Sequence, residues 1–86
     1  MPTMSARISA PMGLHARPAG RLTAAVAQSG IPVRLATSDG KSVDAGSIIM
    51  VMSLGVAQGD VVELIAEDDG TADLLSDLVA ILESAE

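Results

Sequence analysis

Hydrophobic and polar residues alternate in several short segments of this chain. In residues 3–9 every second residue is apolar, which is the period of a half-buried strand. Residues 33–36 repeat the alternation, and residues 61–66 form a further apolar-rich segment. The turn signal Ser38-Asp39-Gly40 allows residues 41–44 to return as a short strand of a hairpin. The pattern therefore predicts four strands.

A helical spacing of three and four residues separates the apolar side chains from Ala16 to Ser29. Proline is tolerated in the first turn of a helix but breaks its interior, so Pro18 places the start of this helix close to His15. Gly30 stands where a glycine that terminates a helix is expected. We therefore predict one long helix between the first two strands.

Two more helices follow. Ser47 is typical of an N-cap residue for a short helix over residues 48–54, which Gly55 closes. Thr71 is expected to cap a final helix that carries a stripe of leucine, valine and isoleucine. The resulting order, β-α-β-β-α-β-α, favours an α+β fold in which the helices pack on one face of a four-stranded sheet.

Composition narrows the class of protein. The 86 residues form one small domain with no aromatic residue and no cysteine, so the core is aliphatic and disulfides are excluded. The longest strongly apolar run, Ile48–Met52, is far shorter than the ~20 residues of a membrane span, and the start of the chain has no signal-peptide core. We expect a cytoplasmic monomer that does not insert into membranes.

Charge is unevenly distributed along the chain. The net charge is −6, which argues against binding nucleic acid. All five basic residues lie in residues 1–59 with two acids, and the other nine acids lie in residues 60–86. This distribution indicates either a solvated acidic face or a mildly basic functional end opposite an acidic back.

His15 is the only histidine, and its surroundings favour phosphoryl transfer. Gly13 precedes it in a loop, and the first predicted helix begins beside it. Free amide hydrogens and the helix dipole make a helix N-terminus an anion site. Arg17 follows two residues later, and Arg21 lies one helical turn beyond. A neutral imidazole here can accept a phosphoryl group, whose charge these groups then stabilise, at ~0.3–1 kcal/mol for each helix-end interaction.

Other chemistries lack the residues that they need. A metal site usually takes several histidine or cysteine ligands, and this chain offers one histidine. There is no nucleophile elbow and no P-loop, although sequence order alone leaves a Ser-His-Asp triad open. A chain this small also has little room for a substrate cleft. We expect neither metal nor cofactor, and a stand-alone enzyme is disfavoured.

The segment Gly13-Leu14-His15-Ala16-Arg17-Pro18-Ala19 closely resembles the active-site signature of the HPr family, the histidine-containing phosphocarriers of the bacterial sugar phosphotransferase system. The segment from Ser47 to Gly55 resembles the second signature of that family, around a regulatory serine. The resemblance covers almost the whole chain. It implies an open-faced β-sandwich of four antiparallel strands with three helices on one face.

The resemblance also implies a function. His15 would receive a phosphoryl group from enzyme I on Nδ1 and pass it to an enzyme IIA component of a sugar permease. Arg17 would help to hold the group, with the backbone amides of Ala16 and Arg17 donating to it. The protein would act only together with these partner enzymes.

Three further roles follow from the same resemblance. Ser47 matches a serine that a dedicated kinase phosphorylates in many Gram-positive bacteria, and it is equally explained as a simple N-cap. Apolar Ile48, Ile49 and Met52 match a patch that docks partner proteins, although some of them must face inward on a short helix. Gly20 and Arg21 complete the expected docking surface.

Gly20 and Met12 depart from the usual residues of the family, which leaves partner preference open. A carrier of the nitrogen-related phosphotransferase branch would share His15. A regulatory module could instead act on a transcription factor through Ser47 without phosphoryl transfer, but it would have no need of His15.

Overall fold

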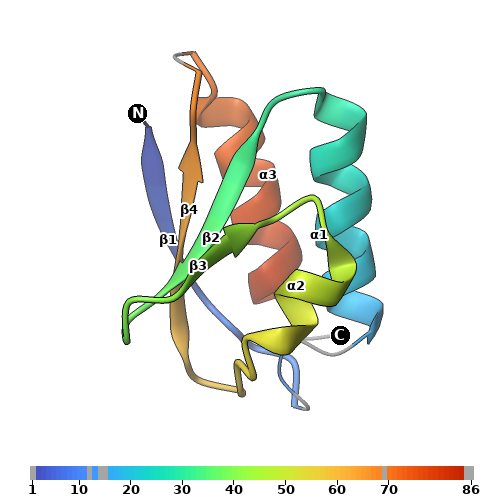
Figure 1. Ribbon diagram of the computed structural model, residues 1–86, viewed down its shortest axis with the longest axis vertical. Helices are drawn as coiled ribbons and strands as arrows, with labels where there is room; N and C mark the ends of the chain where they lie inside the picture. The colour runs from blue at the N-terminus through green and yellow to red at the C-terminus, as the bar shows by residue number, and fades with distance from the viewer. Residues whose placement is uncertain (1, 12, 14–15, 69, 85–86) are drawn as a thin grey trace.

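The computed structural model describes residues 2–11, 13, 16–68 and 70–84, and it contains a four-stranded sheet and three helices (Figure 1). In chain order the elements are β1 (Thr3–Arg7), α1 (Ala16–Ser29), β2 (Val33–Thr37), β3 (Ser42–Asp44), α2 (Ile48–Ser53), β4 (Val61–Ala66) and α3 (Ala72–Glu83). The predicted order β-α-β-β-α-β-α is confirmed.

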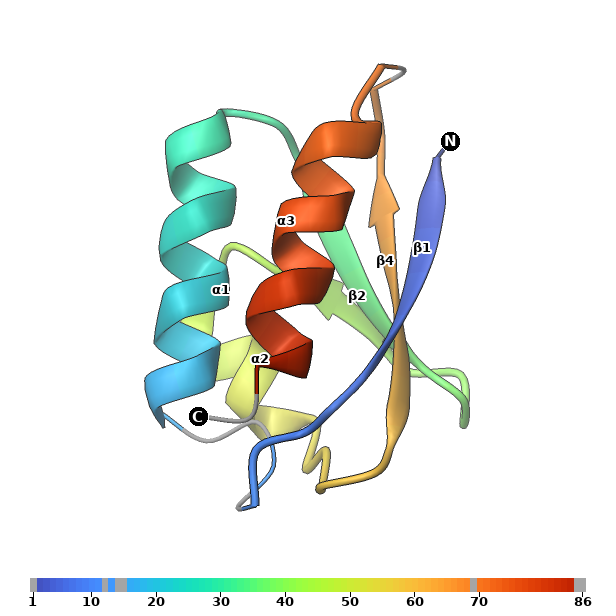
Figure 2. The same ribbon diagram turned by 180° about the vertical axis from the view of Figure 1, so that it is seen from behind.

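The sheet is antiparallel throughout, with the strand order β1-β4-β2-β3. The last strand in the chain, β4, thus lies in the interior of the sheet, where Leu64 faces Met4 of β1 and Leu35 of β2. All three helices lie on one side of the sheet (Figures 1 and 2). The other side is open, as expected for an open-faced α+β fold.

The core lies between the sheet and the two long helices. Alternate residues of β4, namely Val62, Leu64 and Ala66, are buried on the covered side. They pack with a stripe of side chains from α1 and α3, which comprises Leu22, Val26, Leu75, Leu78 and Leu82. Because each strand turns every second side chain toward the helices, the alternation predicted from sequence matches the burial observed.

Helix α1 has the predicted bounds. Pro18 lies in its first turn and is buried, where the missing amide hydrogen costs no intrahelical bond. Gly30 follows its last residue with φ +69°, and its amide donates to the carbonyl of Ala27 at 3.4 Å. Left-handed backbone of this kind favours glycine. Two residues of the sequence therefore fix the limits of this helix.

The predicted N-cap position of Thr71 is confirmed, but the expected side-chain cap is absent. Thr71 precedes α3 but its side chain makes no capping hydrogen bond, and its hydroxyl donates instead to the carbonyl of Asp68 at 3.0 Å. Thr71 is buried, so its hydroxyl is satisfied by the loop that enters the helix and not by the helix itself. Threonine commonly bonds to nearby backbone in this way.

The outer strands are shorter than predicted. Strand β1 ends at Arg7, although Ile8 beyond it is buried, and β3 begins at Ser42 and not at Lys41. The amide of Thr37 donates to the carbonyl of Lys41 at 2.8 Å and closes the hairpin there. Among the described residues, no helix is long and apolar enough to cross a membrane.

Candidate functional site

The candidate site lies where the first loop enters α1. The proposed acceptor His15 and its neighbours Met12 and Leu14 lie outside the described residues. Helix α1 begins at Ala16, so the predicted helix start directly after His15 is confirmed. The first amides of a helix have no acceptor within it. Ala16 and Arg17 therefore offer backbone donors next to His15 in the chain.

The two arginines of the site are available to a ligand. Arg17 and Arg21 are exposed on α1. Within the part of the chain that the structure describes, the ion pair found joins Lys41 to Asp39 at 3.9 Å. Neither α1 arginine is thus neutralised by a described carboxylate, and both guanidinium groups can meet an anion or an acidic partner surface.

Ser47 is the N-cap of α2, as predicted. Its backbone is extended, with φ −112° and ψ 111°, and its Oγ accepts from the amide of Met50 at 3.4 Å. The Ser47 amide donates to the carbonyl of Asp44 at 3.1 Å. The helix ends at Ser53 with Leu54 as its C-cap, and Gly55 follows with φ +67°. Ser47 therefore caps α2 through its side chain, while its own amide is held by Asp44.

An apolar surface covers most of α2. The side chains of Ile48, Ile49, Met50 and Met52, which we call the α2 patch, are 38%, 77%, 46% and 43% exposed. Only Val51 of this helix is buried. The sequence predicted three of the four patch residues, and Met50 is an additional member. Five consecutive apolar residues on a helix that buries one narrow face could have indicated it.

Helices α1 and α2 meet at Gly20 and Ile48. A Cβ atom added at Gly20 would lie 3.7 Å from Cδ1 of Ile48, which is ordinary van der Waals contact. The contact joins the start of α1, which carries Arg17 and Arg21, to the α2 patch. The structure thus brings together the predicted docking residues of two segments that are separated by about thirty residues in the sequence.

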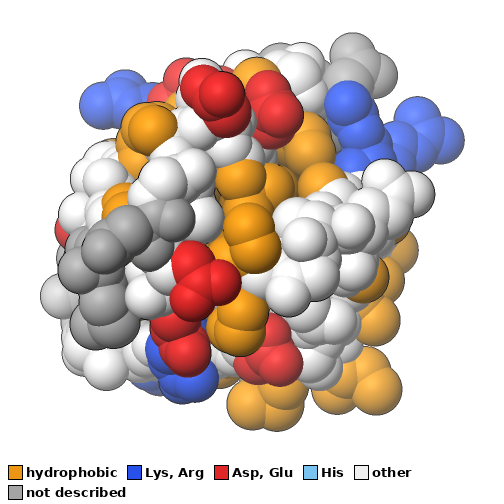
Figure 3. Space-filling view, turned by 90° about the horizontal axis from the view of Figure 1, so that it is seen from above, with side chains coloured by type: hydrophobic (Ala, Val, Ile, Leu, Met, Phe, Trp, Pro, Cys, Tyr) orange, Lys and Arg blue, Asp and Glu red, His pale blue; other side chains and the backbone are white. Residues whose placement is uncertain are grey.

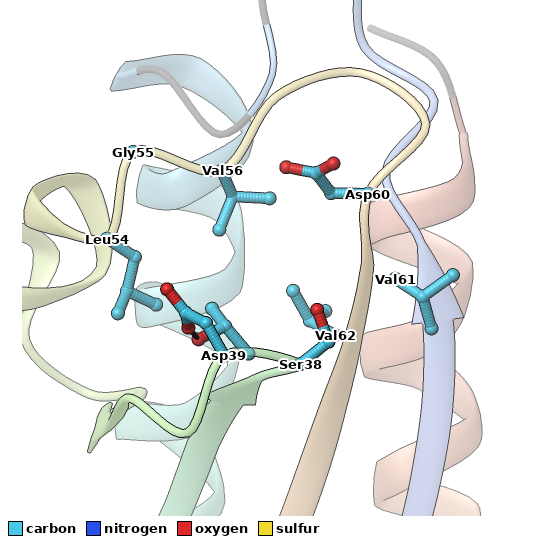
Figure 4. Close-up of a pocket in the computed structure, with 9 residues that line it drawn as sticks. Ser38, Asp39, Leu54, Gly55, Val56, Asp60, Val61 and Val62 are labelled. Carbon is cyan, nitrogen blue, oxygen red and sulfur yellow. Dashed lines mark hydrogen bonds between the residues drawn. The ribbon is translucent and has the colours of Figure 1, made fainter.

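A hollow of about 180 Å³ lies between the β2–β3 turn and the segment that follows α2, lined in part by Asp39, Val56 and Asp60 (Figure 4). It is smaller than the ~300–1,000 Å³ of typical ligand pockets. The hydroxyl of Thr37 donates to Asp39 and lowers the pKa of that exposed carboxyl below its ordinary value of 3.8. The described residues contain no cluster of three or more metal-ligating acidic, histidine or cysteine side chains.

A second hollow, of about 370 Å³, lies near the end of α1 and is lined in part by Ile31, Arg34, Asp44 and Glu67. Its volume reaches the lower end of the range for ligand pockets. The sequence predicted little room for a substrate cleft of typical size. The hollow of Figure 4 is as small as predicted, but the hollow at the end of α1 is larger than predicted. Its lining includes residues at the end of α1, and Figures 1 and 2 show that this end of α1 lies at the opposite end of the molecule from its start.

Exposed acidic side chains flank the loop where β4 leads into α3, at the end of the molecule seen from above in Figure 3, which also shows Lys and Arg side chains around this face. Exposed Glu67, Asp68 and Asp73 lie there, opposite the start of α1. The separation of charge is only partial, because Asp60 and Glu83 lie toward the other end. Glu83 Oε2 accepts from the amide of Arg7 at 3.2 Å. The predicted acidic surface opposite the start of α1 therefore includes Glu67, Asp68 and Asp73 but not Asp60 and Glu83.

Known proteins match this chain over nearly its whole length. Residues 3–84 match a family described as the PTS HPr component phosphorylation site. A phosphocarrier protein HPr of Streptomyces coelicolor is 36% identical over 70 residues, which cover 81% of this chain and 75% of that protein.

Two solved structures share the fold. The structure of HPr-C-His from Thermoanaerobacter tengcongensis is 35% identical, covers 100% of this chain and 99% of its own, and has a TM-score of 0.81. A phosphocarrier protein HPr from Bacillus anthracis is 27% identical, covers 94% of this chain and 95% of its own, and has a TM-score of 0.85. The similarity extends over nearly the full chain in both cases.

Proposed function

Because this chain belongs to the HPr family of phosphocarrier proteins of the phosphotransferase system, we propose that His15 accepts a phosphoryl group from phosphorylated enzyme I and donates it to an enzyme IIA component of a sugar permease. In each step the bond from phosphorus to the donor histidine breaks as the bond to the acceptor forms. The observation that carries this proposal is the start of α1 at Ala16, directly after the single histidine of the chain. The exchange is proposed to take place in the cytoplasm.

The residues after His15 supply hydrogen-bond donors and a positive charge that complement a phosphoryl group. The amides of Ala16 and Arg17 belong to the first turn of α1, where donors point out of the helix toward an anion. The exposed side chain of Arg17 adds a positive charge that no described carboxylate neutralises. These groups act on a phosphoryl group more strongly than on a neutral imidazole, so they favour the phosphorylated state modestly.

The α2 patch is the proposed docking surface for enzyme I and for enzyme IIA. Its four side chains form an exposed apolar area on the helix that meets α1 at Gly20, in the part of α1 that carries Arg17 and Arg21. A surface of this composition suits partners that present apolar side chains with acidic groups around them. Methionine adapts its shape to different contacts, which suits a carrier that serves two unlike proteins.

Ser47 is a proposed regulatory site as well as a cap. A phosphoryl group on its Oγ would carry about −1.5 to −2 charges and would stand beside Ile48, at the edge of the α2 patch. Such a charge opposes apolar docking and acidic partners at this surface. A serine kinase, and a transcription factor that recognises the modified serine, are the partners that this role requires.

Phosphorylation of the intact protein tests the main proposal. We expect an acid-labile phosphate adduct in the intact mass after incubation with phosphoenolpyruvate and enzyme I, and no adduct in His15→Ala. An unmodified mass with an active enzyme I would overturn phosphoryl transfer in the sugar system. Repeating the reaction with the enzyme I of the nitrogen-related branch compares the two branches directly.

The role of Arg17 has a matched control in the chain. Arg34 is an exposed arginine on β2, and its side chain donates to Ser42 at 2.9 and 3.0 Å. We expect Arg17→Ala to slow phosphoryl acceptance by about tenfold or more, since a hydrogen bond to a charged group contributes ~1.5–3 kcal/mol. Arg34→Ala should leave the rate within about twofold. Equal rates in the two variants would remove Arg17 from the site.

A further inference from the structure

The segment between α2 and β4, residues 55–60, is bonded to the chain that leads into the candidate site. The amide of Gly59 donates to the carbonyl of Ile8 at 2.8 Å, and the amide of Ile8 donates to the carbonyl of Asp60 at 2.9 Å. The side-chain amide of Gln58 donates to the carbonyl of Ser9 at 3.2 Å. Residues 8 and 9 are thus held against the α2–β4 segment just before the site loop begins.

Gly13 rests directly on the backbone of the same segment. It is buried, with φ +73°, and its amide donates to the carbonyl of Ala10 at 2.9 Å. A Cβ atom at this position would lie 2.2 Å from the carbonyl oxygen of Val56 and 2.9 Å from Cα of Ala57. No side chain fits there without a shift of backbone. The site loop therefore approaches Val56 and Ala57 as closely as a glycine allows.

The carboxylate of Asp60 holds the surface on which Gly13 rests. Its Oδ2 accepts from the amide of Ala57 at 2.9 Å, and its own amide donates to the carbonyl of Ala57 at 3.1 Å. Figure 4 shows the Asp60 side chain extending across this segment toward Val56. Two hydrogen bonds between two residues close a tight turn, so the backbone at Ala57 depends on Asp60.

We propose that this contact positions the acceptor loop for phosphoryl transfer, with Gly13 and Asp60 as positioning residues. The inference rests on the proposed role of His15. Gly13 lies two positions before His15, and α1 begins one position after it. Consecutive Cα atoms are about 3.8 Å apart, so a link of only two residues joins two fixed points. We therefore expect a displacement of Gly13 to affect transfer at His15.

The chain offers a control for the backbone strain of a side chain at Gly13. Gly30 has φ +69°, close to that of Gly13, but a Cβ atom there would meet nothing within 4 Å. Gly13→Ala and Gly30→Ala thus share the penalty of left-handed backbone, and only Gly13→Ala also forces two segments apart. For Asp60, the variant Asp60→Asn keeps an acceptor oxygen for Ala57, whereas Asp60→Ala removes it.

The test measures single-turnover transfer from phosphorylated enzyme I over a range of enzyme I concentrations. We expect Gly13→Ala to lower the maximal rate by about 10- to 100-fold, the order of loss that a 1 Å misplacement produces. The concentration for half-maximal rate should change by less than about threefold, because the α2 patch is intact. Gly30→Ala should match the wild type within about twofold. Asp60→Ala should be slow and Asp60→Asn close to wild type.

A maximal rate for Gly13→Ala equal to that of Gly30→Ala would overturn the inference. If circular dichroism shows that Gly13→Ala does not fold, the Asp60 pair decides, and equal maximal rates for Asp60→Ala and Asp60→Asn would overturn it. Wild-type protein that accepts no phosphoryl group would instead refute the proposed function, and with it this inference. Fast wild-type transfer with unaffected variants would leave the proposed function intact and remove the positioning role alone.

Discussion

Gly20 provides a quantitative test of how α1 and α2 pack. It lies inside α1, where glycine is ~0.8–1.0 kcal/mol less favourable than alanine. The methyl group of Gly20→Ala would lie 3.7 Å from Cδ1 of Ile48, a contact that requires no movement. Gly20 is half-buried, so the methyl group gains about half of the ~0.8 kcal/mol of a fully buried one. The two contributions together predict that Gly20→Ala stabilises the protein by about 1.2–1.4 kcal/mol.

Thermal and urea unfolding measure this change. A domain of this size gains roughly 4–8 °C in Tm for each kcal/mol. Ala24→Gly is the matched control, because Ala24 is exposed on the same helix and the substitution loses helix propensity without a packing contact. Its destabilisation should be somewhat smaller in size than the stabilisation by Gly20→Ala. A neutral or destabilising Gly20→Ala would refute the packing of α1 on α2 described above.

Three further substitutions test the docking surface, the α2 cap and the lowered pKa of Asp39. Ile49→Ala should lower kcat/KM with enzyme I several-fold while the free energy of unfolding stays within about 0.5 kcal/mol, because the side chain is 77% exposed; an unchanged kcat/KM would contradict its docking role. Ser47→Ala should lower the free energy of unfolding, measured in urea, by about 0.5–1 kcal/mol. This is the low end for the loss of a cap, because the hydrogen bond from the Met50 amide is long at 3.4 Å. An unaltered free energy of unfolding would contradict the capping role. Thr37→Val should raise the pKa of Asp39 toward 3.8 in an NMR titration, because the Thr37 hydroxyl is the main cause of its low value. Because the pKa of Asp39 is lower in the folded protein than in the unfolded chain, its ionised form stabilises the fold at pH values above the unfolded pKa. This stability is lost as the pH falls through the folded pKa, so the wild type and Thr37→Val should converge in stability at lower pH. An unchanged Asp39 pKa in Thr37→Val would rule out the hydrogen bond as the cause of the low pKa.

Local chemistry explains which elements sequence analysis could locate. Pro18 and Gly30 act on the backbone of their own residues, so they fixed both ends of α1. Thr71 takes the N-cap position of α3, but its backbone, with φ −104° and ψ 16°, lacks the extended conformation of a capping residue, and its hydroxyl oxygen accepts no helix amide. The path of the preceding loop decides this conformation.

The α2 patch shows the limit of a hydrophobic pattern. Ile48, Ile49 and Met50 are alike in polarity to buried Val51, and only the packing of α2 against its neighbours determines which face is covered. The sequence suggested docking residues through a family signature and omitted Met50. The exposure of each α2 side chain depends on how the helix packs in the folded protein, so it could not be predicted from the sequence of the helix alone.

The sequence by itself determined the order of the helices and strands, the single candidate acceptor His15 and the arginine beside it, because spacing, proline, glycine and residue type act within a few positions. Only the tertiary structure decided that β1 pairs with β4 and that Gly20 meets Ile48. It also decided that Gly13 rests on Val56 and Ala57, supported by Asp60. These contacts join segments that are far apart in the chain. They form because the segments bury their apolar side chains in one common core, and no local sequence pattern specifies which segments meet there.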